Sequence, residues 1–333
     1  MAHATGADGV VGIDIGGSGS RAVWRAIDGS DEVRVEGPPV RVAVGGASLA
    51  VTIREVLSVL IDAVGDDLAR STSAVCVGAT GLLGLTPRLD DAFTAAQSLL
   101  PQSGVLVASD AVTATVGALG GRPGAVIAAG TGAIALGTDL GRVWQRVDGW
   151  GHVFGDRGSG SWIGAAALRA ATEQHDGRRE DAADLLEECR RVLGPTRGWP
   201  AVIYTNDQRA GVLASLVPGV IALAKSGSIV AARICHEAGS HLARTLAAAI
   251  IPGVPMTAAW TGTLLSSVGP IATAFQREFR DLVPGAALRP PAGSPLDGAL
   301  ALATQAATDS SPPAVVHTDF AAWRRSASER KTP

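Results

Sequence analysis

The chain has 333 residues, of which 47% are hydrophobic and 18% charged, so it is long enough for two domains and apolar enough to bury a core. Its formal net charge of −3 gives no electrostatic reason to bind nucleic acid or an anionic membrane. It has no apolar run of about 18 residues and no signal peptide in residues 1–9, which predicts a cytoplasmic protein with no nucleic-acid or membrane partner.

Short apolar runs alternate with amphipathic segments in the first part of the chain. They predict strands over 10–15, 21–27, 33–36, 74–78 and 104–109, and helices over 48–64, 92–100 and from 110 onward. Strands that alternate with helices predict an α/β sheet covered by helices.

The second part of the chain repeats this pattern more loosely. Strands are expected on both sides of Gly130 and over 141–147 and 257–261, and helices over 162–173, 181–192, 210–226, 229–250 and 296–306. The tail over 309–333 is polar and contains proline, so we expect it to be loosely held. Cys76, Cys189 and Cys235 are widely spaced, which predicts core positions and argues against a disulfide framework or a metal cluster.

A glycine-rich turn over 11–21 joins two of the predicted strands. Its backbone N–H groups are free to point at an anion, because glycine tolerates positive φ and has no side chain in the way. Residues 17–22 also satisfy the dinucleotide fingerprint, but that motif needs a helix directly after the glycines, and here a strand and an Asp-Gly turn follow. An anion-binding hairpin is therefore favoured, with Asp14 either holding the Mg²⁺ of a nucleotide or capping the turn.

A second glycine turn, Gly130-Thr131-Gly132, has the same strand–turn–strand pattern, and two such turns suggest a nucleotide held from both sides. Asp110 follows a predicted strand, and ligands collect at the carboxyl ends of strands in open α/β sheets. Its carboxylate can cap the helix that follows, accept a hydroxyl proton during attack on phosphorus, or do both.

The segment over 148–164 is dense in glycine, tryptophan and aspartate and precedes a predicted helix. Asp156 can accept hydrogen bonds from two sugar hydroxyls and Trp150 offers an apolar wall; the alternative is a long turn capped by Ser159. His236 and His241 are spaced i, i+5 rather than i, i+4, so we reject a zinc protease and expect surface positions on a helix.

These segments together resemble a known family. Residues 14–20, 129–133 and 259–263 look like the phosphate-1, phosphate-2 and adenosine motifs of the actin- and hexokinase-like ATPases. Residues 149–164 resemble the sugar-kinase signature of the N-acetylglucosamine kinase and glucosamine kinase branch of the BadF/BadG ATPase family. The resemblance covers roughly residues 10–306. It implies α/β architecture with two ribonuclease-H-like domains and an interdomain cleft.

In residue numbers, the resemblance implies a first domain over 1–113 completed by a helix over 296–308, a second domain over 114–295, and a tail over 309–333. It also implies a homodimer. The implied activity is transfer of phosphate from ATP, with Mg²⁺, to the 6-hydroxyl of an amino sugar.

The resemblance also assigns roles to individual residues. Asp110 would be the general base, and Asp14 would hold Mg²⁺ through water. ATP would contact Gly16, Gly17, Ser18, Gly19, Ser20, Arg21, Gly130, Thr131, Gly132, Gly262 and Thr263. The sugar would contact Asp110, Thr131, Gly149, Trp150, Gly151, His152 and Asp156.

Two departures from the family pattern bear on specificity. Family members commonly carry Glu where this chain has Arg157, and Gly-Gly where it has Gly262-Thr263. Glucosamine and N-acetylglucosamine therefore stay open as acceptors, with N-acetylmuramate or another hexose as alternatives. A dehydratase-activating ATPase would need cysteines placed to hold a cluster between subunits, and a sugar-sensing repressor would need a DNA-binding module. A sugar-binding protein without catalysis is the remaining non-enzyme alternative.

Overall fold

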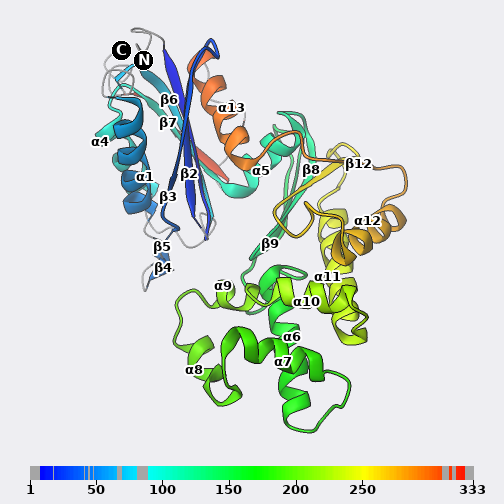
Figure 1. The fold of residues 1–333 in the computed structure, drawn as a ribbon. Coiled ribbons are helices and arrows are strands. Elements are labelled where there is room, and N and C mark those ends of the chain that lie inside the picture. Colours follow the sequence, from blue (N-terminus) through cyan, green and yellow to red (C-terminus); the bar gives the residue numbers. More distant parts are fainter. Residues whose placement is uncertain are drawn as a thin grey trace. The chain divides into compact units, whose positions relative to one another are not determined.

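The computed structural model describes residues 8–17, 19–40, 49–65, 70–80, 89–309, 315–316 and 320–326, with the backbone of 42–43 and 46–47. The chain divides into two compact units: unit 1 is Met1–Arg122 with Pro291–Pro333, and unit 2 is Pro123–Pro290. Each unit carries its own sheet (Figure 1). The domain boundary expected after residue 113 falls inside a helix, α5 (Asp110–Leu119), and the units divide after that helix instead.

Unit 1 is built on a six-stranded sheet in the order β13-β7-β6-β1-β2-β3. The first three strands form an antiparallel meander, and β6 and β7 run parallel to β1. The predicted strands are confirmed as β1 (Gly9–Ile15), β2 (Ser20–Ala26), β3 (Glu32–Gly37), β6 (Thr72–Ala79) and β7 (Gly104–Ser109). A short ribbon of β4 (Val42–Ala43) and β5 (Gly46–Ala47) stands apart from this sheet.

Helices cover both faces of this sheet (Figure 1). On one face, α1 (Leu49–Val64) lies against β2 and β3, and α4 (Leu89–Leu99) lies against β7. The apolar core on this face includes Val11 of β1 and Trp24 of β2. On the other face, α5 packs with α13 (Pro295–Thr308), which lies against β1 and β6. Gly12 permits this contact, because a Cβ there would lie 2.8 Å from the backbone nitrogen of Leu300.

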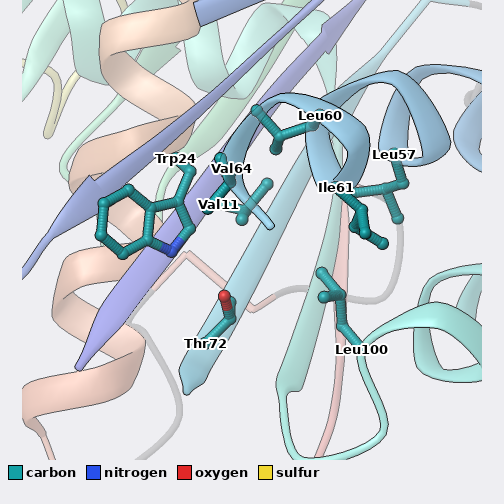
Figure 2. Close-up of a pocket in the computed structure, with 8 residues that line it drawn as sticks. All are labelled: Val11, Trp24, Leu57, Leu60, Ile61, Val64, Thr72 and Leu100. Carbon is teal, nitrogen blue, oxygen red and sulfur yellow. The ribbon is translucent and has the colours of Figure 1, made fainter. Parts of the chain in front are cut away.

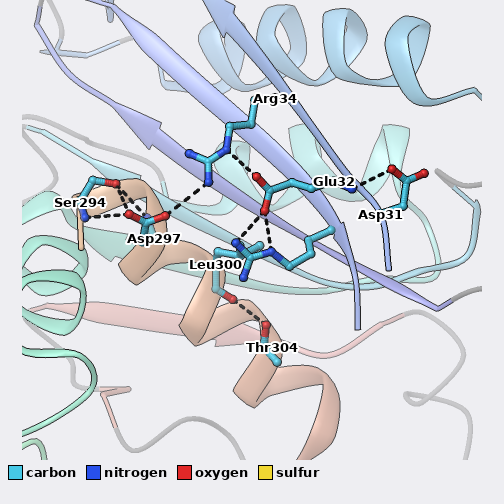
Figure 3. Close-up of polar contacts among 8 residues, drawn as sticks. Asp31, Glu32, Arg34, Ser294, Asp297, Leu300 and Thr304 are labelled. Carbon is cyan, nitrogen blue, oxygen red and sulfur yellow. Dashed lines mark hydrogen bonds and ion pairs between the residues drawn. The ribbon is translucent and has the colours of Figure 1, made fainter. Parts of the chain in front are cut away.

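The start of α13 is tied to the edge of the sheet by charge pairs (Figure 3). Ser294 and Asp297 form a capping box, in which each side chain accepts a hydrogen bond from the other residue's backbone N–H. Arg34 of β3 lies 3.6 Å from the Asp297 carboxylate and 2.6 Å from that of Glu32. These contacts fix the C-terminal helix on unit 1.

A small apolar cavity lies between α1 and the sheet (Figure 2). Its volume is about 10 Å³, which is about the room that one water molecule needs. Its lining is Val11, Trp24, Leu57, Leu60, Ile61, Val64, Thr72 and Leu100. It is a packing defect of the core and is too small for a nucleotide or a sugar.

The tail was expected to be loosely held, and the structure corrects this over part of its length. Residues Ala321–Arg324 form β13, which pairs antiparallel with β7 at the edge of the sheet. Trp323 lies over Gly104, where any side chain would collide with the indole. The strand therefore depends on a contact between residues far apart in the sequence, which local composition does not encode.

Unit 2 carries a five-stranded sheet in the order β10-β9-β8-β11-β12. The expected strands are confirmed as β8 (Gly124–Ala129), β9 (Ala133–Thr138), β10 (Trp144–Asp148) and β11 (Thr257–Thr261), and β12 (Ala287–Arg289) is additional. Its helices are α6 (Gly160–His175), α7 (Ala183–Leu193), α8 (Trp199–Tyr204), α9 (Arg209–Ala214), α10 (Val217–Lys225), α11 (Ile229–Ala248) and α12 (Pro270–Leu282), with a 3₁₀ turn at Thr196–Gly198.

The single helix expected over 210–226 is two helices, α9 and α10. Pro218 lies in the first turn of α10, where its missing N–H and fixed φ suit a helix start rather than an interior position.

No single described helix is long and apolar enough to span a membrane. The helices over 209–225 and 229–248 have the length and composition of a membrane span only when taken together, and the chain bends by 117° between them. Apolar residues of α10 and α11 belong to the core of unit 2.

The three cysteines are buried, as expected. Cys76 lies in β6, and Cys189 and Cys235 lie on α7 and α11. Burial raises the pKa of each thiol, so none is a thiolate at neutral pH.

Candidate functional site

Two carboxylates of unit 1 lie at the same edge of its sheet. Asp14 is near the end of β1, and Asp110 directly follows β7; both strands are parallel to β6, which lies between them. Burial and the negative charge of Asp110 raise the pKa of Asp14 to about 6, and Arg21 opposes this shift. The two side chains are therefore close enough to repel one another when both are ionised.

Ser109 and not Asp110 caps α5. The Ser109 Oγ accepts a hydrogen bond from the Ala111 N–H at 3.2 Å, and Asp110 is the first residue of the helix. The capping role considered for Asp110 therefore belongs to its neighbour. Asp110 lies in the first turn of this helix, at the end that carries the partial positive charge of the helix dipole.

The first glycine turn links β1 to β2 in unit 1. The Gly16 N–H donates to the Gly19 carbonyl at 2.9 Å, and the Gly16 carbonyl accepts from Val40 at 3.2 Å. Gly17 is exposed, and a Cβ there would meet nothing within 4 Å. Ser18 lies outside the described residues. The turn thus presents open backbone at Gly17.

The two residues after this turn point to opposite faces of the sheet. Ser20 pairs with Ile15 and is 2% exposed on the α1 face, where its Oγ has no hydrogen-bond partner among the described residues. The structure thus corrects the expectation that this hydroxyl faces the phosphates. Arg21 pairs with Asp14 on the other face and lies 3.9 Å from Glu36.

The second glycine turn, in unit 2, is held by the start of α6. Gly130 N–H donates to the Gly132 carbonyl at 2.9 Å, closing the turn. Gly160 N–H donates to the Gly130 carbonyl at 2.8 Å, and Ser161 N–H to that of Thr131 at 3.1 Å. Thr131 is exposed, so its side chain is accessible while its carbonyl is engaged.

The third glycine turn lies beside the second. Gly262 follows β11, which is parallel to β8, so both turns lie at the carboxyl ends of their strands. Its φ is +94°, and a Cβ would collide with the backbone of Ala129, so only glycine fits here. Leu264 N–H donates to the Ala129 carbonyl at 3.3 Å, and Thr263 is exposed between them.

The loop over 149–158, which we call the 149–158 loop, is organised by two aspartates. Asp148 accepts hydrogen bonds from the N–H groups of Asp156 at 2.7 Å and Arg157 at 2.8 Å. The Asp156 carboxylate in turn accepts a hydrogen bond from the Gly151 N–H at 3.2 Å. It also accepts one from the N–H of Ala133, which directly follows the second glycine turn. Asp156 is thus a link between two loops.

Asp156 is strained and buried, which is unusual for a residue that only shapes a turn. Its φ is +53°, in the left-handed region, and it is 8% exposed. Burial, with a contribution from the charge of Asp148, raises its pKa to about 6. A strained, buried carboxylate with a raised pKa is a feature typical of functional sites.

Trp150 and His152 occupy the outer part of the 149–158 loop. The Trp150 side chain is 61% exposed, and the Arg146 guanidinium lies 4.4 Å from its ring centroid. Arg146 also donates to the Gly149 carbonyl at 2.7 Å. His152 is half-buried, and burial together with the positive charge of Arg209 lowers its pKa. The loop therefore presents an open indole and a neutral imidazole at neutral pH.

The two histidines of α11 differ in their surroundings. His236 is exposed, as expected, and contacts Arg277 at 2.6 Å. His241 is half-buried: its Nε2 lies 3.2 Å from the Arg157 guanidinium, and its ring lies 5.0 Å from that of Trp162, edge to face. Sequence reasoning missed this contact with the 149–158 loop.

No group of three or more metal-ligating side chains occurs among the described residues.

Comparison with known proteins identifies the family. A model of the BadF/BadG/BcrA/BcrD ATPase family matches residues 11–266. The chain is also 30% identical over 241 residues to an N-acetylmuramic acid/N-acetylglucosamine kinase of Clostridium acetobutylicum, covering 70% of this chain and 76% of that protein. The chain belongs to the BadF/BadG/BcrA/BcrD ATPase family.

Solved structures confirm the fold. A proposed N-acetylglucosamine kinase from Chromobacterium violaceum matches with a TM-score of 0.71 and 26% identity, over 89% of this chain and 98% of that one. A glucokinase from Streptomyces griseus, solved with glucose and AMPPNP, matches with a TM-score of 0.54 and 18% identity, over 89% and 99%. The expected α/β architecture of the actin-like ATPases is confirmed.

Proposed function

We propose that this protein is an ATP-dependent sugar kinase that phosphorylates the 6-hydroxyl of an amino sugar, either glucosamine or N-acetylglucosamine. The observation that carries the proposal is the pair Asp14 and Asp110 at one edge of the unit 1 sheet, in a chain that belongs to an ATPase family. The Clostridium relative, named for phosphorylating amino sugars, supports the choice of acceptor.

Asp110 acts as the general base. Its carboxylate accepts the proton of the acceptor hydroxyl as that oxygen bonds to the γ-phosphorus, while the bond from this phosphorus to the bridging oxygen breaks and ADP leaves. The position of Asp110 suits this role, because it directly follows β7, and ligands collect at the carboxyl ends of strands in open α/β sheets.

Asp14 fits a metal ion held mainly by phosphate and water. Burial and the charge of Asp110 raise the pKa of Asp14 although Arg21 opposes the shift, so a divalent cation would relieve the remaining repulsion between the two carboxylates. Two carboxylates are too few to hold Mg²⁺ alone, which fits the usual Mg²⁺ site completed by water and nucleotide phosphates. When bound, Mg²⁺ neutralises the charge of the transferring phosphoryl group.

Unit 2 supplies phosphate and acceptor contacts in this proposal. The exposed Thr131 and the glycine turns at Gly130 and Gly262 hold the nucleotide, and the 149–158 loop holds the sugar. The Asp156 carboxylate accepts a hydrogen bond from a sugar hydroxyl, using lone pairs that the N–H groups of Gly151 and Ala133 leave available. The open face of Trp150 packs on the sugar ring.

A panel of acceptors tests the proposal. Purified protein with ATP and Mg²⁺ is given glucosamine, N-acetylglucosamine, N-acetylmuramate and glucose, and both ADP and the phosphosugar are measured. Phosphorylation of an amino sugar, absent with its 6-deoxy analogue, is the expected result. A protein that phosphorylates none of the four sugars is not the kinase proposed here.

N-acetylmuramate is the second candidate acceptor, because the name of the Clostridium relative includes N-acetylmuramic acid as well as N-acetylglucosamine. The same panel distinguishes N-acetylmuramate from N-acetylglucosamine, because only N-acetylmuramate carries a substituent with a carboxylate. A dehydratase activator receives no support from the cysteines, because all three thiols are buried with raised pKa values.

A further inference from the structure

We infer that His241, on α11, is a positioning residue for the 149–158 loop, and that it acts as a neutral imidazole that accepts a hydrogen bond from Arg157. The inference rests on the proposed function, in which this loop holds the acceptor sugar. His241 itself touches neither substrate in this scheme; it acts through Arg157.

The contact between these two residues defines the protonation state of the histidine. The Arg157 Nη2 lies 3.2 Å from the His241 Nε2, and a guanidinium can only donate. Nε2 must therefore be the acceptor, which places the proton on Nδ1 and leaves the ring uncharged. A protonated ring would have no acceptor to offer and would repel the guanidinium.

The surroundings of His241 favour the neutral ring. Burial and the charges of Arg157 and Arg244 lower its pKa, while Glu237 and Asp148 oppose the shift. These charged groups come from the loop, from α11 and from the end of β10, and Trp162 of α6 faces the ring edge to face. The imidazole is thus held on several sides.

A second observation ties the loop to the same helix. Gly158 has a φ of +86°, and a Cβ there would collide with the backbone of Ala238 and lie 3.0 Å from the Leu242 side chain. The loop backbone therefore lies directly on α11 one residue after Arg157. The Arg157 side chain and the Gly158 backbone anchor the loop to one turn of this helix.

The anchor bears on Asp156 through the backbone. Asp148 holds the N–H groups of Asp156 and Arg157 together, and Asp156 sits at a strained φ of +53°. A strained conformation persists only where its neighbours fix it on both sides. Arg157 fixes the C-terminal side of Asp156, because its side chain is held on α11 by His241. Loss of that contact lets the backbone of Asp156 relax away from the conformation that binds the sugar.

The experiment compares His241→Ala, His241→Gln and His236→Ala. We expect His241→Ala to raise the KM for the sugar about tenfold, the usual effect of one charge-assisted hydrogen bond, with the KM for ATP unchanged. Glutamine offers an amide oxygen to Arg157, so His241→Gln should restore most of the affinity. His236→Ala is the matched control, because His236 lies on the same helix and also contacts an arginine, but that arginine, Arg277, belongs to α12 and not to the loop.

Acidification provides a readout that a merely structural role would not move. The sugar KM of the wild type should rise as the pH falls through the lowered pKa of His241, and His241→Gln should lose that component while keeping any contribution from Asp156. An unchanged sugar KM in His241→Ala, or a pH profile of His241→Gln identical to the wild type, overturns the inference.

Amide hydrogen exchange separates this inference from the proposed function, because it needs no acceptor. Faster exchange over residues 149–159 in His241→Ala, but not in His236→Ala, supports the positioning role even if no sugar in the panel is phosphorylated. Equal exchange in the two variants overturns the positioning role whatever the enzyme's activity.

Discussion

Asp148 accepts the backbone N–H of Asp156 at 2.7 Å, and both residues have left-handed backbone conformations, with φ of +63° and +53°. Non-glycine residues rarely adopt this region, since it costs about 1–2 kcal/mol each. The two aspartates close the 149–158 loop from both ends, because Asp156 in turn accepts the N–H of Gly151. The loop is therefore organised by carboxylates rather than by a hydrophobic core.

We expect Asp148→Ala to weaken acceptor binding more than it weakens the fold. The change removes the acceptor for two backbone N–H groups, which costs about 2 kcal/mol, and frees Asp156 and Arg157. The sugar kcat/KM should fall at least tenfold, measured by phosphosugar formation, while urea unfolding shows a loss of about 2 kcal/mol.

Asp139→Ala is the matched control. Asp139 also accepts two backbone N–H groups, from Gly141 and Val143 at 2.8 Å each, but in the turn between β9 and β10. The Asp139→Ala variant should lose a similar amount of stability and keep the wild-type kcat/KM for the sugar. Equal losses of kcat/KM in the two variants would mean that Asp148 has no specific role in acceptor binding.

Asp110→Asn should abolish turnover while preserving the binding of ATP and sugar. Asparagine has the shape of aspartate but cannot accept the hydroxyl proton, so we expect kcat to fall by about 10²–10⁴. Calorimetric titration should show little change in the Kd of either ligand. Asp91→Asn, at an exposed position on α4 of the same unit, should leave kcat unchanged. Retained turnover in Asp110→Asn would exclude Asp110 as the base.

Gly262→Ala tests whether the third glycine turn must approach the second so closely. Alanine would be strained at a φ of +94° and would also collide with the backbone of Ala129, pushing the two turns apart. We expect a higher KM for ATP and a loss of stability of about 3 kcal/mol.

Gly285→Ala separates the two causes of that loss. Gly285 has a similar φ of +86°, and a Cβ there would meet nothing within 4 Å. This control should lose only the backbone component, about 1–2 kcal/mol, and keep its KM for ATP. An equal effect of both substitutions would show that the close approach to Ala129 is unimportant.

The sequence predicted most elements of the fold because their signals are local. Short apolar runs marked β1 and β7, and helical spacing marked α1 and α11. The composition of the tail does not predict β13, because this strand depends on pairing with β7. The helical spacing over 210–226 does not reveal the break before α10, where Pro218 lies in the first turn.

The candidate site was predicted unevenly for a similar reason. Asp14 and Asp110 were placed correctly at strand ends, because parallel strands bring their carboxyl ends to one edge. The period of two along β2 puts Ser20 on the same face as Trp24, a signal that was available and would have turned its hydroxyl toward the core. The contact of His241 with Arg157 joins residues 84 positions apart, and no local pattern encodes it.

Asp14→Asn should make the ligand-free protein more stable at pH 8 while abolishing its activity. The folded state raises the pKa of Asp14 from 3.8 to about 6, so between about pH 4 and 6 the folded chain binds more protons than the unfolded chain. Stability therefore falls as the pH rises through this window, and above it the ionised carboxylate costs the fold about 3 kcal/mol. Asparagine carries no charge and escapes this cost.

The measurement is urea unfolding of both proteins from pH 4 to pH 8, without nucleotide or metal. The variant should exceed the wild type by about 3 kcal/mol at pH 8, and the gap should close toward pH 4, where the wild-type carboxyl is protonated. Asp110→Asn should recover only part of the gain, because burial is the larger cause of the shift and the charge of Asp110 the smaller. A variant less stable than the wild type at pH 8 would mean that Asp14 stabilises the ligand-free fold, and it would remove the electrostatic reason to place Mg²⁺ beside it.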